Sequence, residues 1–149
     1  MALLDILIYP DQRLHIKAKH VKTVSSRIQK LINDMSETMY EAPGIGLAAP
    51  QVNVLERIIV VDISESKDSL LVMVNPEFIS SSGLAEHEEG CLSVPNSYAK
   101  VDRAETVTVA ALNENGEEFV LDAEQILAIC IQHELDHLQG KLFIDYLSS

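Results

Sequence analysis

The 149-residue sequence has few basic residues, few cysteines and no long apolar run. Its 11 lysines and arginines form no cluster, and with 23 aspartates and glutamates they give a formal net charge of -12. Nucleic acids and anionic membranes are bound through clustered Lys and Arg, so we expect neither as a partner. No apolar run approaches the roughly 20 residues of a membrane-spanning helix, and the N-terminus lacks the basic region of a secretory signal. These absences indicate a cytoplasmic protein.

Only two cysteines are present, Cys91 and Cys130, which are too few for a disulfide framework. In an intracellular chain such thiols stay reduced and serve in catalysis, in metal binding or as small buried apolar residues. We expect the buried role for Cys130. The neighbours of Cys91 favour a metal-binding role.

The chain also lacks repeats, linkers and low-complexity segments. Apolar residues make up 47% and charged residues 23%, which is ordinary for a globular protein. We therefore expect residues 1–149 to form a single domain.

The order of elements predicts an α+β fold. A helix is expected over residues 25–41, because Ser25 or Ser26 can cap it and its apolar residues form one stripe, namely Ile28, Leu31, Ile32, Met35 and Met39. Segments 57–63 and 70–76 are rich in β-branched residues and predict paired strands. Segments 104–112 and 117–122 flank an Asn-Gly turn and predict a hairpin. A second helix is expected over residues 122–138, opened by a capping-box-like pair of Asp122 and Gln125. The expected architecture is a largely antiparallel sheet packed around this C-terminal helix, with an N-terminal helix.

The C-terminal helix contains the pattern His-Glu-x-x-His at His133, Glu134 and His137. Histidines four residues apart lie on one face of a helix and can bind one metal ion, and the intervening glutamate can move a proton to or from bound water. A lone buried histidine is more often a hydrogen-bonded core residue than a metal ligand, because metal ligands come in sets. The pair on one apolar stripe favours a metal site.

A tetrahedral site with two histidines needs a third protein ligand. One candidate is Asp145, which is the only carboxylate after His137 and leaves a cramped geometry. The other is Cys91 in the segment HEEGCLSVP, residues 87–95. A thiolate with two imidazoles suits zinc or ferrous iron.

The segment PGIGLAAPQ, residues 43–51, consists of small residues followed by the amide of Gln51. It lacks the Lys and the Ser or Thr of a phosphate-binding loop. A helix stop with a close-packed turn would explain Pro43 and Gly44. A loop that brings its backbone against an extended substrate, with Gln51 stabilising an oxyanion, fits better.

Three segments together resemble the peptide deformylase family: GIGLAAPQ, EGCLS and QHELDH, in that order. The surrounding segments RIIVVDIS, NPEF, RAETVTVAALNENGEEF and LAICIQHELDHLQGKLFIDYLS extend the resemblance over nearly the whole chain. Many bacterial members continue past FIDYLS into a C-terminal helical tail, which this sequence lacks.

The resemblance implies a metal-dependent hydrolase that removes the N-formyl group from the initiator formylmethionine of new polypeptides and releases formate. It implies one divalent ion on Cys91, His133 and His137, with Fe(II) expected and Zn, Ni or Co possible. Metal-bound hydroxide would attack the formyl carbon while Glu134 acts as general base and acid. Gln51 and the backbone N–H of Leu92 would stabilise the oxyanion, at about 3 kcal/mol for each such donor.

The resemblance also assigns substrate contacts. The backbone of Ile45 and Gly46 would pair with the substrate main chain. Ile126, Ile129 and Cys130 would form the wall of a methionine pocket, although bulk-core packing explains Ile126 equally well. The partners expected are formyl-Met nascent polypeptides at the ribosome, and no signal for an oligomeric state is present.

Two further expectations concern ionisable side chains. Glu89 and Arg103 match an acid and a base of the family and are expected to pair and hold the Cys91 segment; two solvated surface charges are the alternative. His15, His20 and His87 are expected to be ordinary surface histidines.

Two other functions are open to the sequence. A general metallopeptidase would need a carboxylate or histidine as third ligand. A structural metal domain would need a fourth protein ligand, and Cys130 is poorly placed to supply one.

Overall fold

The computed structural model describes residues 3–146, which form two antiparallel sheets and two α-helices. The strands are β1 (Gly46–Ala48), β2 (Ile58–Val61), β3 (Leu71–Ser82), β4 (Ala85–Cys91), β5 (Val94–Arg103), β6 (Thr106–Leu112) and β7 (Glu118–Glu124). The helices are α1 (Ser26–Glu41) and α2 (Gln125–Leu138), with short 3-10 turns η1 (Gln12–His15), η2 (Ala49–Val52) and η3 (Phe143–Tyr146). The main sheet has the order β1-β2-β3-β6-β7, and β4 and β5 form a separate hairpin. The expected α+β fold is confirmed.

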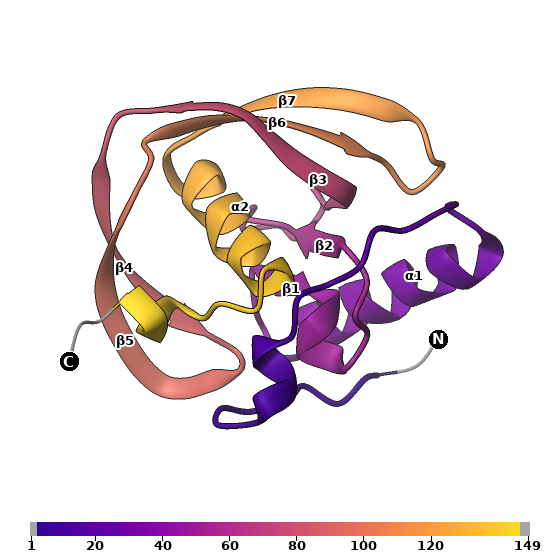
Figure 1. The fold of residues 1–149 in the computed structure, drawn as a ribbon, viewed down its shortest axis with the longest axis horizontal. Helices are drawn as coiled ribbons and strands as arrows, with labels where there is room; N and C mark the ends of the chain where they lie inside the picture. Colours follow the sequence, from indigo (N-terminus) through magenta and orange to yellow (C-terminus); the bar gives the residue numbers. More distant parts are fainter. Residues whose placement is uncertain (1–2, 147–149) are drawn as a thin grey trace.

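Helix α2 lies at the centre of the molecule, framed by β3, β6 and β7 on one side and by the β4–β5 hairpin on another (Figure 1). It contacts β1, β2, β6 and β7. Its buried residues include Ala128, Ile131 and Leu135, which join one core cluster with alternate residues of the sheet. The expected packing of the sheet around the C-terminal helix is therefore confirmed.

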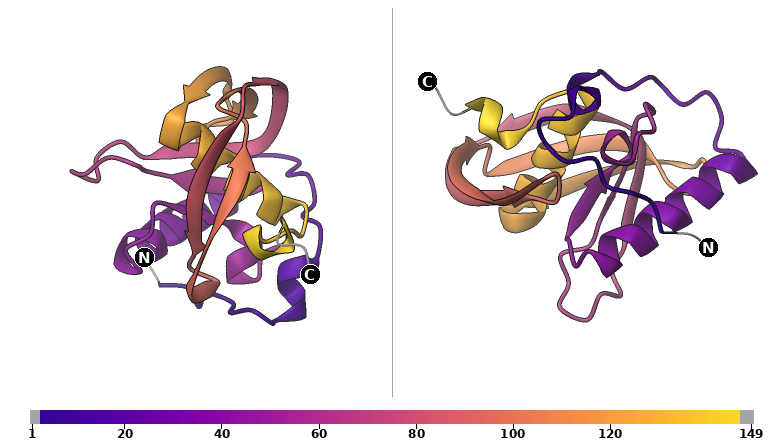
Figure 2. Two further views of the ribbon diagram at one scale, coloured as in Figure 1. Left: turned by 90° about the vertical axis from the view of Figure 1, so that its left-hand side faces the viewer. Right: turned by 90° about the horizontal axis from the view of Figure 1, so that it is seen from below.

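Strand β2 is buried on both faces, because α1 and α2 lie on opposite sides of it (Figure 2). Ile59 and Val61 join the cluster of α2, whereas Ile58 and Val60 join the cluster of α1. This alternation follows from the two-residue period of a strand. Burial on both faces explains why the sequence of β2, IIVV, is a continuous apolar run.

Helix α1 forms as the sequence predicts. The hydroxyl of Ser25 accepts a hydrogen bond from Ile28 N–H, which is the N-cap interaction expected. The stripe residues Ile28, Ile32, Met35 and Met39 are buried against β1 and β2, and Leu31 is half-buried at its edge. The helix ends before Pro43.

Helix α2 begins three residues later than predicted. Asp122 belongs to β7, where its carboxylate accepts a hydrogen bond from the Thr108 hydroxyl on β6 at 2.7 Å. The N-cap of α2 is Glu124, which makes no side-chain capping bond. The predicted capping-box pair of Asp122 and Gln125 is therefore wrong, because strand pairing extends β7 to residue 124.

The predicted paired strands and hairpin are present as β2–β3 and β6–β7. Strand β3 continues beyond the predicted end at Pro76 to Ser82, with irregular register against β6 near Asn75 and Pro76. A bulge lets a strand contain proline without losing the sheet. Within residues 3–146, no helix is long and apolar enough to cross a membrane.

Candidate metal centre

Cys91 lies at the end of β4, and the turn of the β4–β5 hairpin brings it over α2. Figure 2, left, shows this hairpin in front of the helix. Strands β4 and β5 were not predicted, because the segment is rich in charged residues and poor in β-branched residues. The pairing of Cys91 with Val94 leaves Leu92 and Ser93 in the turn.

His133 and His137 lie one turn apart on the buried face of α2. His137 Nε2 lies 3.3 Å from His133 Nε2 and 3.4 Å from Cys91 Sγ. The three donor atoms lie within 4.8 Å of one another, and they form the one group of three or more such residues found among residues 3–146. A soft thiolate with two imidazoles is a donor set for zinc or ferrous iron. The residues therefore fit a divalent ion.

The other candidate ligand, Asp145, makes a local hydrogen bond away from the two histidines. Its carboxylate accepts a hydrogen bond at 2.8 Å from the N–H of Leu142, the residue before η3. It does not join the two histidines. Of the two alternatives for a third ligand, the geometry favours Cys91.

A buried charge network orients His133. Its Nδ1 donates to Glu89 Oε1 at 2.9 Å, so that Nε2 faces the other two donors. Arg103 donates to both oxygens of Glu89, at 2.7 and 2.8 Å, and to the carboxylate of Asp136. The expected pairing of Glu89 with Arg103 is confirmed, and both side chains are buried rather than solvated. A carboxylate behind a ligating histidine fixes its tautomer and orientation.

The same network sets the protonation of its members. Burial alone would raise the pKa of Glu89, but hydrogen bonds from Arg103 and His133 outweigh it and lower the pKa to about 2. Burial lowers the pKa of His133, but hydrogen bonds with Cys91 and Glu89 outweigh it and raise the pKa to about 10. Burial and the positive charge of His133 lower the pKa of His137 well below its usual value. A bound cation requires both imidazoles to be neutral, so binding must displace a proton from His133.

Glu134 is buried between α2 and β1. Burial, as the largest cause, raises the pKa of its carboxyl to about 7. Its Oε1 has no hydrogen-bond partner among the described residues. A Cβ placed on Gly46 would lie 2.5 Å from Glu134 Oε2, so position 46 must be glycine for the carboxylate to occupy this place. The carboxylate is thus available to a water molecule or a substrate.

Gln51 reaches the centre from η2. Its Oε1 accepts a hydrogen bond from Ala48 N–H at 2.9 Å, which leaves Nε2 to donate to Ser93 Oγ at 3.1 Å. Nε2 also lies 3.6 Å from Cys91 Sγ. The amide N–H groups of Gln51 therefore point toward Cys91 and Ser93. Ser93 is fully buried, and sequence reasoning missed it because a serine in a turn carries no distinctive signal.

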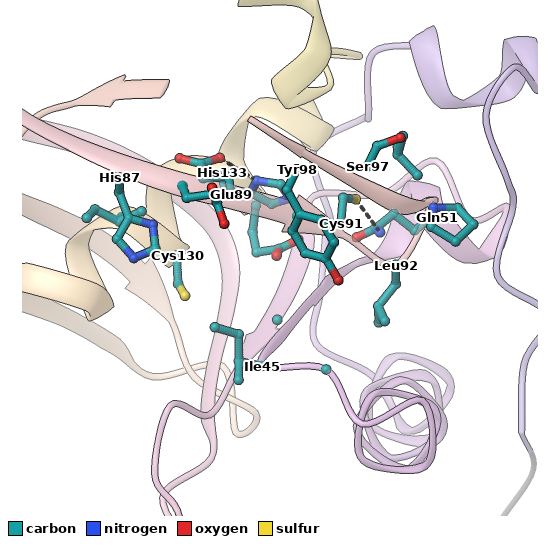
Figure 3. Close-up of a pocket in the computed structure, with 18 of the residues that line it drawn as sticks. Ile45, Gln51, His87, Glu89, Cys91, Leu92, Ser97, Tyr98, Cys130 and His133 are labelled. Carbon is teal, nitrogen blue, oxygen red and sulfur yellow. Dashed lines mark hydrogen bonds and ion pairs between the residues drawn. The ribbon is translucent and has the colours of Figure 1, made fainter. Parts of the chain in front are cut away.

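A cavity of about 480 Å³ opens beside these residues (Figure 3). It is lined by Ile45 and Gly46 from the loop and β1, by Cys91 and Leu92 from the hairpin, by Gln51, and by Ile129, Cys130, His133 and Glu134 from α2. Cys130 is buried, as expected, and burial raises the pKa of its thiol to about 12. The structure thus brings together most of the residues that the sequence singled out.

Ile126 does not join this group. It lies in the first turn of α2, is 39% exposed and does not line the cavity. It is also absent from the buried core, which was the alternative. Because α2 starts later than predicted, Ile126 lies in its first turn, outside both the cavity wall and the buried core.

His87 also departs from expectation. His15 and His20 are exposed, as expected, whereas His87 is half-buried and lines the cavity. The expectation that His87 is an ordinary surface histidine is wrong, because β4 was not predicted and its inward positions could not be assigned.

Residues 3–149 match a family model described as polypeptide deformylase. This chain belongs to the polypeptide deformylase family. Members of the family remove the N-formyl group from the initiator methionine of nascent polypeptides and are metal-dependent hydrolases.

Individual deformylases support this assignment. The chain is 65% identical to a peptide deformylase of Pseudoalteromonas translucida over 99% of this chain and 89% of that protein. It resembles a crystal structure of a peptide deformylase from Legionella pneumophila with a TM-score of 0.95 at 53% identity, covering 98% of this chain and 86% of that one. A deformylase of Ehrlichia chaffeensis, solved in complex with actinonin, matches with a TM-score of 0.97 at 38% identity, covering 100% and 91%.

Proposed function

We propose that this chain hydrolyses the formyl group of formylmethionyl polypeptides, with Cys91, His133 and His137 holding one divalent ion. The observation that carries the proposal is the convergence of these three donors within 4.8 Å, beside the uncommitted carboxylate of Glu134. When bound, the ion supplies Lewis acidity, which polarises a carbonyl oxygen and acidifies water. Fe(II) is the expected ion, and zinc, nickel or cobalt can take its place in such a donor set.

Glu134 is the proposed general base and acid. Its unpartnered oxygen accepts a proton from the attacking water and returns it to the amine nitrogen that leaves as the formyl C–N bond breaks. Its unpartnered oxygen and its position in the cavity wall beside His133 support this role. The products are formate and a free amino terminus.

Gln51 and Leu92 are the proposed oxyanion donors. Gln51 supports this role through the orientation of its amide, whose oxygen is committed to Ala48 N–H. The Leu92 backbone N–H follows the Cys91 ligand directly in the hairpin turn. Such donors stabilise charge that develops on the formyl oxygen in the transition state.

Strand β1 is the proposed docking edge for the substrate backbone. It lies at the edge of the main sheet and pairs with β2 on one side through Gly46 and Val61. The carbonyl of Ile45 accepts a hydrogen bond from Asp62 N–H, which fixes the loop against β2. An extended peptide can add to the other side of such an edge. Ile129 and Cys130 are then the proposed wall for the methionine side chain.

The proposed setting is the cytoplasm, where the enzyme meets formyl-Met chains as they leave the ribosome. We propose that residues 1–149 act as a single catalytic domain. No nucleic-acid contact is needed for this role.

The test is a formate-release assay on formyl-Met-Ala-Ser under anaerobic conditions, with the protein loaded with iron or with nickel. We expect formate release that stops when a chelator removes the metal and resumes when metal is restored. Cys91→Ser should lose or severely alter this activity. Full activity of Cys91→Ser, or no formate from folded, metal-loaded protein, would contradict the proposal. Cleavage of internal peptide bonds would instead indicate a general metallopeptidase.

A further inference from the structure

His87 is a polar residue in the wall of a largely apolar part of the cavity. It lies on β4 opposite Val101 of β5, and it lines the same cavity as Ile129 and Cys130 of α2. Figure 3 shows His87 and Cys130 at the same end of this cavity. A substrate side chain that enters between the hairpin and the helix would therefore contact the imidazole.

The two ring nitrogens of His87 differ in their surroundings. Nδ1 is buried and has no hydrogen-bond partner among residues 3–146. Nε2 is not enclosed in this way, and it too makes no hydrogen bond within the described part of the chain. A neutral imidazole has one N–H donor and one acceptor nitrogen, and a buried unpaired N–H is rarer than a buried unpaired acceptor. We therefore assign the proton to Nε2, which leaves a free donor at the cavity.

The other ionisable groups on this wall are committed or lie elsewhere. Glu89 is held by Arg103 and His133, and both Glu88 and Tyr98 are exposed. Cys130 stays a protonated thiol, because burial raises its pKa to about 12. His87 thus offers a hydrogen-bond donor beside the apolar wall of Ile129 and Cys130.

We propose that His87 is a specificity-determining residue that donates from Nε2 to an acceptor on the first side chain of the substrate. The inference rests on the proposed function, since it requires that side chain to enter this cavity. The methionine thioether is a weak acceptor and norleucine, its hydrocarbon isostere, has none. Methionine sulfoxide presents a polar oxygen. The cavity therefore accepts oxidised formylmethionine and discriminates against norleucine.

The physical basis is the cost of an unpaired donor. When a hydrocarbon side chain covers Nε2–H, the donor loses water and gains no partner, so binding is penalised. A site built to hydrogen-bond a group on its substrate rejects the analogue that lacks it. Replacing His87 by an apolar residue should remove both the penalty for norleucine and the advantage for the sulfoxide.

The test compares formyl-Met-Ala-Ser with the same peptide carrying norleucine or methionine sulfoxide at the first position. For each metal-loaded sample, kcat/KM is measured by formate release, and ratios between substrates are used because metal content cancels in them. His87→Leu should lower the sulfoxide-to-norleucine ratio about tenfold, which is the effect of one hydrogen bond. His87→Gln retains an N–H donor near the position of Nε2 and should keep most of the ratio.

His20→Leu is the matched control, because it removes an exposed histidine outside the cavity and should leave every ratio unchanged. Should His87→Leu not fold, His87→Val provides a second apolar variant with high strand propensity. An unchanged ratio in the apolar variants, or an equal loss in His87→Gln, overturns the inference while activity on formyl-Met-Ala-Ser stands. Failure of the wild-type protein to release formate from formyl-Met-Ala-Ser contradicts the proposed function instead.

Discussion

The two faces of β2 are both buried, but the helices that cover them are built differently. The face toward α1 packs against an apolar cluster that includes Ile28, Ile32, Met35 and Met39. The face toward α2 also packs against an apolar cluster, but α2 buries three polar residues as well, namely His133, Glu134 and His137. Burying polar groups costs free energy unless they are paired.

The partners that pair the polar groups of α2 come from a distant part of the chain. Glu89 and Arg103 lie on the β4–β5 hairpin, and they bind His133 and Asp136 of the helix. On the α1 side, the ion pair of Arg27 with Glu56 lies at the surface. Helix α1 thus supplies stability, whereas α2 and the hairpin together hold a site whose charges depend on each other.

The largest effect should come from Glu134→Gln, which removes the proposed proton carrier from the α2 side. We expect kcat for formate release to fall about 10²–10⁴-fold, since a general base typically contributes that factor. Metal content, measured by elemental analysis, should remain. The matched change on the other helix, Glu37→Gln, should leave activity unchanged. Retention of most activity in Glu134→Gln would assign the proton transfer to another group.

Arg103→Ala should have the next largest effect, because it removes two hydrogen bonds and the paired positive charge from the buried carboxylate of Glu89 and leaves His133 to pair with it. Breaking a buried pair in this way costs about 3–5 kcal/mol in the free energy of unfolding. Metal retention should also fall, since Glu89 orients His133. On the α1 side, Arg27→Ala should cost only about 0.2–1 kcal/mol, as exposed pairs do. Denaturant unfolding measures the stability of each variant, and elemental analysis measures its metal content. Unchanged metal retention in Arg103→Ala would rule out the orienting role of Glu89.

The same contrast explains which features the sequence predicts. Helix α1 follows from a capping serine and a regular apolar stripe, both local signals. The pattern His-Glu-x-x-His is equally local, and it identifies directly the residues that α2 contributes to the site. These elements required no knowledge of the rest of the chain.

The hairpin that completes the site was not predictable in this way. Strands β4 and β5 contain HEEGC and similar charged segments, and they form because each pairs with the other and packs on Leu142 and Phe143. Without those strands, no sequence pattern shows that His87 faces the cavity or that Glu89 and Arg103 are buried. Such assignments depend on contacts between residues far apart in the chain.

Met35→Ala tests the apolar face of β2. Met35 is fully buried in the α1 cluster, and its truncation should cost about 2–5 kcal/mol in the free energy of unfolding. The kcat of the protein that remains folded should not change, because Met35 does not line the cavity. Leu31→Ala, at the half-buried edge of the same helix, should cost less. A drop in kcat without a change in stability would show that the two faces are coupled.

The smallest effect should come from Asp62→Asn, at a polar contact that ties α1 to the end of β2. Tyr40 of α1 donates to Asp62 at 2.6 Å. Burial alone would raise the pKa of Asp62, but hydrogen bonds from Ser64, Tyr40 and Ser69 outweigh it and lower the pKa. A lowered pKa means that the folded state favours the carboxylate, so Asp62 stabilises the fold fully above its unfolded pKa of about 3.9. This stabilisation is lost as the pH falls through the folded-state pKa. Asp62→Asn should therefore cost about 1 kcal/mol at neutral pH. Unfolding curves of the two proteins should converge as the pH drops below about 3.9, and a difference that persisted unchanged in acid would place its cause outside the carboxylate.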